Sequence, residues 1–213
     1  MTYTGDVQAG GPADVRELPA VTISKLAVGP FDNNAYLIRC NDTGDGLLID
    51  AAAEADRLLE LIGGMPIGRI VTTHRHGDHW QALEEVARAT GALVIAHPLD
   101  APELPVPVDL TVEHGDRVTV GVVSMDVVHL RGHTPGSIAL HYNGHLFTGD
   151  SLFPGGVGNT EKDPERFAQL FADVSERLFD RFPDETWVYP GHGKDTTLGA
   201  ERPSLPAWRE RGW

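Results

Sequence analysis

Residues 67–79 restrict the possible folds of this chain strongly, because an apolar run passes directly into a polar, histidine-rich turn. The run IGRIVTT is followed by HRHGDH, which places His74, His76, Asp78 and His79 within six positions. Imidazole and carboxylate groups this close together each need a polar partner if they are buried. Either this is a hydrated surface loop that happens to be rich in histidine, or it surrounds a large positive charge.

Length and composition are typical of a globular protein. The 213 residues are enough to bury a sizeable core, and 41% of them are apolar. No apolar run approaches the roughly 20 residues that span a bilayer, so no membrane partner is expected. Residues 1–18 lack the basic start and apolar block of a secretory signal. We interpret them as a flexible lead-in before a single domain over residues 19–213.

Charge and cysteine content indicate the class of substrate and the cellular compartment. Lysine and arginine total 17 against 31 acidic residues, a net charge of −14, which repels nucleic-acid phosphates and favours a small-molecule substrate. The single cysteine, Cys40, allows no internal disulfide and fits a reducing compartment. We therefore expect a cytoplasmic protein with no nucleic-acid partner.

The first half of the chain reads as strands, followed by an alternation of strands and helices. β-Branched and aromatic residues predict strands over 21–28, 34–40, 47–51, 67–74 and 92–97. Asp45-Gly46 predicts a hairpin. Helical apolar spacing predicts one helix over 54–62 and a second that starts at Asp78 or a neighbour and ends at Gly91. Such alternation is typical of helices packed on a sheet.

The second half repeats this order of strands and then a helix. Strands are predicted within 112–150 and again over 185–193. Asp163-Pro164 predicts the start of the most regular helix, whose apolar residues are Phe167, Leu170, Phe171, Val174, Leu178 and Phe179. Two similar halves of this kind indicate a two-sheet sandwich with helices outside.

Four polar motifs share one placement, at the point where an apolar strand ends. They are HRHGDH after IVTT, GHTPG after VVHL, GD after HLFT and GHG after WVYP. Because strands of layered sheets present their ends on a common edge, these loops can converge on one spot. The potential metal ligands are His74, His76, Asp78, His79, His133, Asp150 and His192.

Seven nitrogen and oxygen donors are more than one four-coordinate zinc ion can use. Divided between two ions with one carboxylate shared, they fit a two-metal site. On an extended segment His74 and His76 point the same way and can bind one ion, while the turn at Gly77 lets Asp78 and His79 face the second. Taken singly, His133 or His192 would more often be structural than a ligand.

The sequence THRHGDH, GHTPGS, FTGDSLF and YPGHG, in this order, resembles the metallo-β-lactamase superfamily, and within it the glyoxalase II-like hydroxyacylglutathione hydrolases. The resemblance implies an α/β fold, a four-layer αββα sandwich with the metals at the edge between the sheets. It implies that the first metal is bound by His74, His76 and His133 and the second by Asp78, His79 and His192. Asp150 would bridge the two ions, and Asp50 would orient the ligands from behind.

The motifs also separate branches of this superfamily. Asp150 argues against true β-lactamases, which carry cysteine or no carboxylate there, and GHTPGS with FTGDSLF favours thioesterases over lactonases. About twenty residues follow His192, which indicates a short form lacking the C-terminal helical region of glyoxalase II. Asn159 stands where relatives often have a basic residue, and Lys162 is only nearby. A thiol other than glutathione is therefore an equally good expectation.

The resemblance predicts a dinuclear metal-dependent hydrolase of a small-thiol thioester, acting on an S-2-hydroxyacyl thiol through water activated by metal. The expected cofactors are two divalent ions, zinc first, with iron or manganese also suited to these ligands. Asp78 is the predicted catalytic residue, which orients the attacking water and accepts its proton. Phe153 and Trp80 are candidate pocket walls or core residues, and Arg75 most simply points to solvent.

Three alternatives remain. A persulfide dioxygenase-like enzyme would use one iron bound by His74, His133 and Asp150. A lactonase or phosphodiesterase of the same superfamily would use all seven donors, and a non-catalytic binding module would use none of them for chemistry. The sequence leaves the thiol carrier, the native metal and the oligomeric state open.

Overall fold

The computed structural model describes residues 2–212, and these residues contain two large facing β-sheets. The first sheet has the order β1 (Asp14–Glu17), β2 (Val21–Val28), β3 (Asn33–Cys40), β4 (Gly46–Ile49), β5 (Ile67–Val71), β6 (Leu93–Ala96) and β7 (Leu110–Thr111). The second has the order β15 (Thr196–Thr197), β14 (Trp187–Pro190), β11 (His145–Gly149), β10 (Ile138–Tyr142), β9 (Val123–His129) and β8 (Arg117–Val120). A small hairpin pairs β12 (Leu152–Phe153) with β13 (Gly156–Val157).

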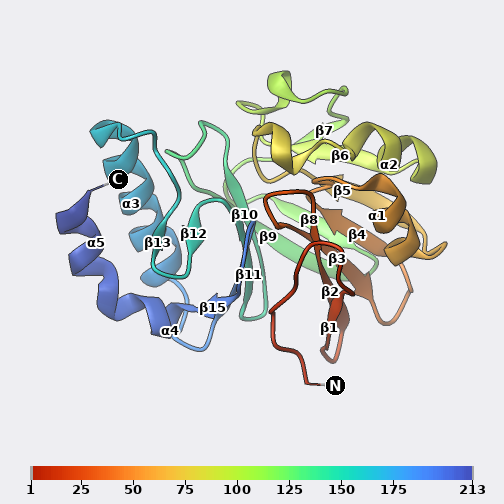
Figure 1. Cartoon of the computed structure of the whole chain (residues 1–213), viewed down its shortest axis with the longest axis horizontal. Coiled ribbons are helices and arrows are strands. Elements are labelled where there is room, and N and C mark those ends of the chain that lie inside the picture. The colour runs from red at the N-terminus through yellow and green to blue at the C-terminus, as the bar shows by residue number, and fades with distance from the viewer. Residues whose placement is uncertain (1, 213) are drawn as a thin grey trace.

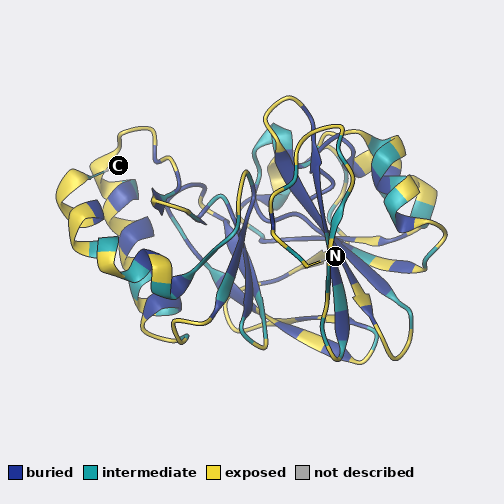
Figure 2. Cartoon of the chain, turned by 60° about the horizontal axis from the view of Figure 1, so that its bottom comes forward, coloured by how far each residue is buried: buried dark blue, intermediate teal, exposed yellow. Residues whose placement is uncertain are grey.

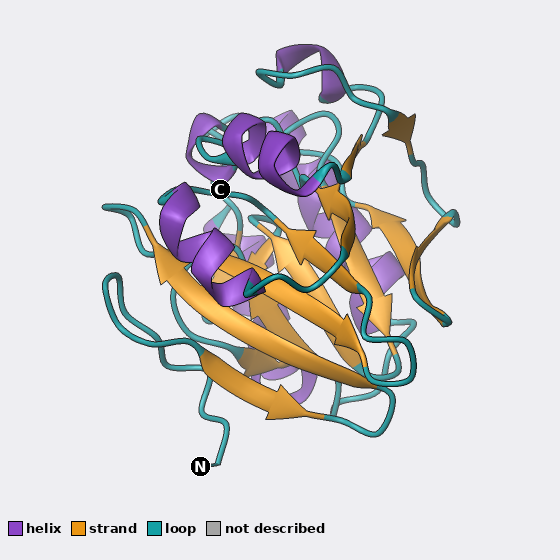
Figure 3. Cartoon of the chain, turned by 90° about the vertical axis from the view of Figure 1, so that its right-hand side faces the viewer, coloured by secondary structure: helices purple, strands orange, loops and turns teal. Residues whose placement is uncertain are grey.

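Helices cover the two outer faces. Figure 1 shows α1 (Ala55–Ile62) and α2 (Leu83–Thr90) on the right, and α3 (Pro164–Val174), α4 (Leu198–Glu201) and α5 (Leu205–Arg211) on the left, with the strands between them. Figure 3 shows α1 and α2 lying over the long strands of the first sheet. The predicted αββα four-layer sandwich is therefore confirmed.

Three apolar clusters hold the four layers together. The central one fills the space between the sheets and includes Tyr36, Phe147 and Tyr189. A second cluster joins the first sheet to α1 and α2, and a third joins the second sheet to α3 and α5, where Trp208 is buried. Figure 2 shows the consequence, with buried strands inside and exposed faces on the helices. Burial of apolar area is the main favourable term in such packing.

Local sequence signals explain several element boundaries. Gly63 and Gly91 end α1 and α2 in the left-handed conformation, as predicted. The Asp163 side chain caps α3 by accepting hydrogen bonds from the backbone of Glu165 and Arg166. The predicted continuation of this helix to Phe179 is a π-helical turn over Ser175–Phe179.

The second helix begins later than predicted. Residues Gly77–His79 form a 3₁₀ turn, and α2 starts at Leu83 rather than near Asp78. The backbone N–H groups of Gln81 and Ala82 are hydrogen-bonded to the carbonyl groups of Ala52 and Ala51. These long-range hydrogen bonds fix the position of residues 81 and 82, and α2 begins directly after them.

Part of residues 1–18, which the sequence suggested to be a flexible lead-in, belongs to the first sheet. Asp14–Glu17 form the edge strand β1, which pairs antiparallel with β2. Further upstream, the Tyr3 hydroxyl donates to Asp195 and Gly5 O accepts from the buried ammonium of Lys25. Met1, the first residue of this lead-in, lies outside the described residues.

Strand direction brings the polar loops to one edge. β4 and β5 are parallel neighbours, so Asp50 and the segment starting at His74 leave the first sheet together. In the second sheet β9, β11 and β14 all run in the same direction, since β10 is antiparallel to both β9 and β11, and β11 is parallel to β14. Asn34 N donates to Gly191 O at 2.7 Å and joins the two sheets at this edge.

Within residues 2–212, none of the helices has the length and apolar character needed to cross a membrane.

Candidate metal centre

The structure brings together all seven predicted ligands, although they come from four separate loops. His74, His76, Asp78 and His79 follow β5, and the other three follow β9, β11 and β14. Their donor atoms form three groups, each with its atoms within 4.8 Å of one another. These are His74, His76 and His133, then His74, His79 and Asp150, and finally Asp78, His79 and His192.

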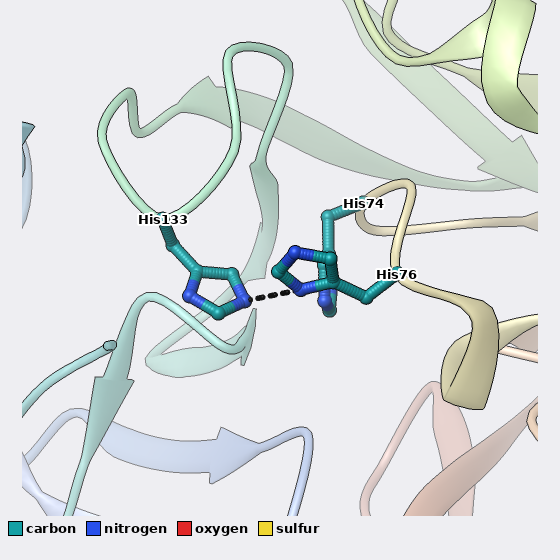
Figure 4. A group of neighbouring side chains, drawn as sticks. All are labelled: His74, His76 and His133. Atoms are coloured by element: carbon teal, nitrogen blue, oxygen red, sulfur yellow. Dashed lines mark hydrogen bonds between the residues drawn. The ribbon is translucent and has the colours of Figure 1, made fainter. Parts of the chain in front are cut away.

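The first group consists of three imidazoles that face one another (Figure 4). His76 Nδ1 lies 2.9 Å from His133 Nε2. His74 is 1% exposed and His133 is 5% exposed, so both rings are shielded from water. These are the three residues that the resemblance assigns to the first ion.

The group of Asp78, His79 and His192, called the second group from here on, contains two imidazoles and a carboxylate. His79 Nε2 lies 3.1 Å from His192 Nε2, and His192 Nε2 lies 3.3 Å from Asp78 Oδ2. His79 is fully buried, whereas the side chain of Asp78 remains 28% exposed. Water can therefore reach this group from the side of Asp78.

Asp150 lies between the two groups. Its Oδ1 is 3.3 Å from His79 Nε2, and its Oδ2 is 3.4 Å from His192 Nε2 and 3.7 Å from His133 Nε2. A carboxylate with these neighbours is placed to be shared between two cations.

Hydrogen bonds behind the rings define which nitrogen faces the centre. His79 Nδ1 donates to Asp50 Oδ2 at 2.9 Å, His133 Nδ1 donates to Asn159 O at 2.8 Å, and His192 Nδ1 donates to Phe31 O at 2.9 Å. In a neutral imidazole the proton at Nδ1 leaves a lone pair at Nε2. In the neutral form that a metal ligand must take, all three Nε2 atoms would present lone pairs toward Asp150.

This donor set fits metal ions. Lone pairs 3.1 Å apart and beside a carboxylate repel one another unless a cation lies between them. A tetrahedral zinc ion with Zn–N bonds of about 2.0 Å separates its ligand nitrogens by about 3.3 Å, close to the spacings found. His74 Nε2 and Asp150 Oδ1 are also buried without a hydrogen-bond partner. Coordination would satisfy both atoms.

The electrostatics of the cluster favour positive charge. Burial lowers the pKa of His74 and His133, which keeps both rings neutral. Burial also acts to lower the pKa of His79, but the charge of nearby Asp150 and the hydrogen bond to Asp50 raise it to about 10. Although burial opposes ionisation, His79 holds the pKa of Asp150 well below its usual range.

Supporting residues complete the centre. Asp50 accepts hydrogen bonds from Thr73 N and Thr73 Oγ1, both at 2.7 Å, in addition to His79. The resemblance predicts an orienting role for Asp50, and these are the groups that Asp50 contacts. Asn33 was not predicted, yet its Nδ2 donates to Asp78 Oδ2 at 2.9 Å. The only signal for Asn33 in the sequence is a polar pair, Asn33-Asn34, at the start of an apolar strand.

The remaining candidates have different surroundings. Trp80 packs against the cluster beneath α1 and α2, and its Nε1 donates to Arg75 O at 2.8 Å, so it supports the histidine loop. The ring of Phe153 is 6.4 Å from that of His192 and is partly exposed, which suits a wall of the site. The five other histidines, His97, His114, His129, His141 and His145, lie outside the three donor groups.

Comparison with known proteins agrees with this fold and geometry. The family model of the metallo-beta-lactamase superfamily matches residues 28–192, and the chain therefore belongs to this superfamily. A hydroxyacylglutathione hydrolase of Fuscovulum blasticum is 39% identical over 165 residues, which cover 76% of this chain and 62% of that protein. The predicted relationship to hydroxyacylglutathione hydrolases is thus confirmed. The chain spans less than two thirds of the length of that relative.

Other relatives match nearly their whole length. An uncharacterized protein of Aquifex aeolicus (strain VF5) is 30% identical over 203 residues, covering 86% of this chain and 95% of that protein. The crystal structure of ETHE1 from Myxococcus xanthus is 30% identical with a TM-score of 0.79, covering 88% of this chain and 84% of that one. The crystal structure of TTHA1623 in a di-iron-bound form is 35% identical with a TM-score of 0.74, covering 86% of this chain and 98% of that one.

Proposed function

We propose that this protein is a dinuclear metal-dependent hydrolase of a small-thiol thioester, with an S-2-hydroxyacyl thiol as substrate. The observation that carries the proposal is the arrangement of two donor groups with Asp150 between them. The similarity to hydroxyacylglutathione hydrolases supports the thioester as the bond that is cleaved. Zinc is the first expectation, and the di-iron-bound form of TTHA1623 makes iron the main alternative.

Divalent ions in such a site supply Lewis acidity and lower the pKa of bound water toward neutrality. His74, His76 and His133 would hold one ion, and Asp78, His79 and His192 the other, with Asp150 shared. The neutral rings of His74 and His133 can bind a cation without first losing a proton. The hydrogen bond that His79 Nδ1 donates to Asp50 keeps that ring turned toward the centre.

Asp78 is the residue we assign to proton transfer. Although burial acts to raise it, the hydrogen bond from Asn33 and the charge of His79 bring the pKa of Asp78 below its ordinary value. Asp78 is therefore a carboxylate that can accept a proton from water and orient it. Its partial exposure leaves it accessible to water. Asn33 fixes the carboxylate plane by donating to Oδ2.

The composition supports an expected compartment and an expected class of substrate. We infer a cytoplasmic enzyme, because its one cysteine, Cys40, is buried and unpaired. The net charge of −14 supports a small-molecule substrate over nucleic acid.

The test combines metal analysis with a substrate screen. We expect purified protein to contain two divalent ions and to hydrolyse S-lactoyl esters of small thiols. Asp78→Asn should keep the fold and lower kcat at least about 10²-fold, the typical contribution of a general base. Asp56→Asn in the first turn of α1 is the matched control and should behave as the wild type. Protein without bound metal, or full activity of Asp78→Asn, would contradict the proposal.

A second candidate is oxidation of a persulfide by molecular oxygen at a single iron, which His74, His133 and Asp150 would bind. The likeness to the ETHE1 structure supports it, as does the 3.7 Å separation of His133 Nε2 and Asp150 Oδ2. One iron per chain and oxygen consumption with a persulfide, without thioester hydrolysis, would favour this function over the first.

A further inference from the structure

Asp100 is a buried carboxylate that the proposed chemistry does not use. It lies in the loop after β6, directly before the 3₁₀ turn Ala101–Glu103, and is 1% exposed. An ionised carboxylate removed from water is costly unless several donors satisfy it. The identity of these donors therefore indicates what Asp100 does in the fold.

Its three donors come from two different loops of the metal centre. Asp100 Oδ2 accepts from the backbone N–H of Arg75 at 3.0 Å, and Arg75 lies between His74 and His76. The same oxygen accepts from Thr134 Oγ1 at 2.5 Å, and Oδ1 accepts from Gly136 N at 2.8 Å. Thr134 and Gly136 lie one and three residues after His133. One carboxylate thus holds both loops that carry the first group of histidines.

The contact is close enough to require glycine at position 136. A Cβ atom at Gly136 would lie 2.8 Å from Asp100 Cγ and from its backbone N. Thr134 is further fixed by Ser137, whose Oγ lies 2.6 Å from Thr134 Oγ1. The loop after His133 is therefore packed directly onto Asp100.

Asp100 resembles Asp50 in its hydrogen bonding but differs in what it contacts. Asp50 accepts from Thr73 and from the ring of His79, so it orients a donor of the second group. The hydrogen bonds of Asp100 involve backbone groups and a hydroxyl, and no imidazole. Asp100 can therefore affect the ligands by setting how far apart the two loops lie. One measure of that spacing is the 2.9 Å between His76 Nδ1 and His133 Nε2.

We propose that Asp100 is a positioning residue of the first metal position: its buried carboxylate ties the loop of His74 and His76 to the loop of His133 and so sets the spacing of these three histidines. The inference rests on the proposed dinuclear centre. Loss of Asp100 therefore weakens one ion selectively, whereas a purely structural role would lower stability without distinguishing the two ions.

The test is the affinity of each ion in Asp100→Asn. The amide keeps the size of the side chain but turns a donor toward groups that are themselves donors. Chelator competition with zinc, and the visible spectrum of the cobalt-substituted protein, should show one ion weakened about 10–100-fold and the other unchanged. Asp109→Asn is the matched control, because Asp109 also accepts a backbone N–H, from Val94 at 2.8 Å, but contacts neither loop.

Thr134→Val provides a second variant that leaves the carboxylate in place and removes the hydrogen bonds of the Thr134 hydroxyl to Asp100 and to Ser137. It should weaken the same ion, by less than Asp100→Asn. Wild-type protein that binds no ion would contradict the proposed function itself. Wild-type protein with two ions, together with Asp100→Asn that binds both unchanged or loses both equally, would overturn only the role of Asp100.

Discussion

At the scale of single residues, Gly191 shows how closely the backbone approaches the candidate metal ligands. A Cβ atom at this position would lie 2.2 Å from Asp150 Oδ1 and 2.7 Å from His79 Cε1. Contacts this short cannot be relieved without moving Asp150 or His79. Glycine is needed here because of close approach, whereas at Gly149 the backbone φ of 48° is an additional reason.

We predict that Gly191→Ala lowers the metal affinity about 10–100-fold, as the loss of a supporting contact does. Metal analysis after dialysis against a weak chelator measures the effect. Gly68→Ala in β5 is the control, because a Cβ atom there meets nothing within 4 Å. Full metal content in Gly191→Ala would show that the centre is more open than the structure indicates.

At the scale of elements, α3 stabilises the loop of His133 from the outside. Arg166 in its first turn donates to Gly132 O at 2.9 Å and to His133 O at 2.5 Å. Asp173, farther along the helix, accepts from the backbone and guanidinium of Arg131 at 2.7–2.9 Å. Formation of the first turn of α3 is therefore linked to the position of His133, a predicted metal ligand.

We predict that Asp163→Ala lowers the free energy of unfolding by about 1 kcal/mol, because the cap of α3 is lost. Asp163 Oδ1 accepts from Glu165 N at 2.8 Å and Arg166 N at 3.1 Å, and alanine leaves both donors without this partner. Urea denaturation measures the change. Asp163→Ser keeps a capping oxygen and should remain close to the wild-type stability, while equal losses in both variants would argue against capping.

At the scale of the whole molecule, Lys25 joins segments that are far apart in the chain. Its ammonium is fully buried and donates to Gly5 O and Gly193 O, both at 2.7 Å, and to Asp195 Oδ1 at 2.6 Å. Asp195 also accepts from Tyr3 and Trp187. This network holds the N-terminal segment against the loop of His192. Burial lowers the pKa of Lys25, and Asp195 acts in the opposite direction.

We predict that Lys25→Met lowers the free energy of unfolding by about 3–5 kcal/mol, because Asp195 is left as a buried charge without its counterion. The double variant Lys25→Met/Asp195→Asn removes that charge and should lose less stability than the single variant. Urea denaturation of the three proteins tests this comparison. A double variant that is less stable than Lys25→Met would contradict the explanation by an uncompensated charge.

Local patterns were sufficient for most of the architecture. The β-branched run at Val21–Val28 and the glycines after α1 and α2 act within a few residues, so their structural outcome could be predicted. The start of α2 and the presence of strand β1 could not be predicted in this way. The first depends on hydrogen bonds to Ala51 and Ala52, and the second on pairing with β2 and on the polar network around Lys25.

The same division applies to the candidate site. The sequence alone determined which side chains are the candidate donors, because four motifs placed histidine and aspartate at the ends of apolar strands. Only the tertiary structure decided how these donors are held. Asn33, Asp100 and the carbonyl groups of Phe31 and Asn159 act on distant loops. Hydrogen bonds of this kind leave no periodic pattern in a sequence, since their partners become neighbours only after the two sheets pack.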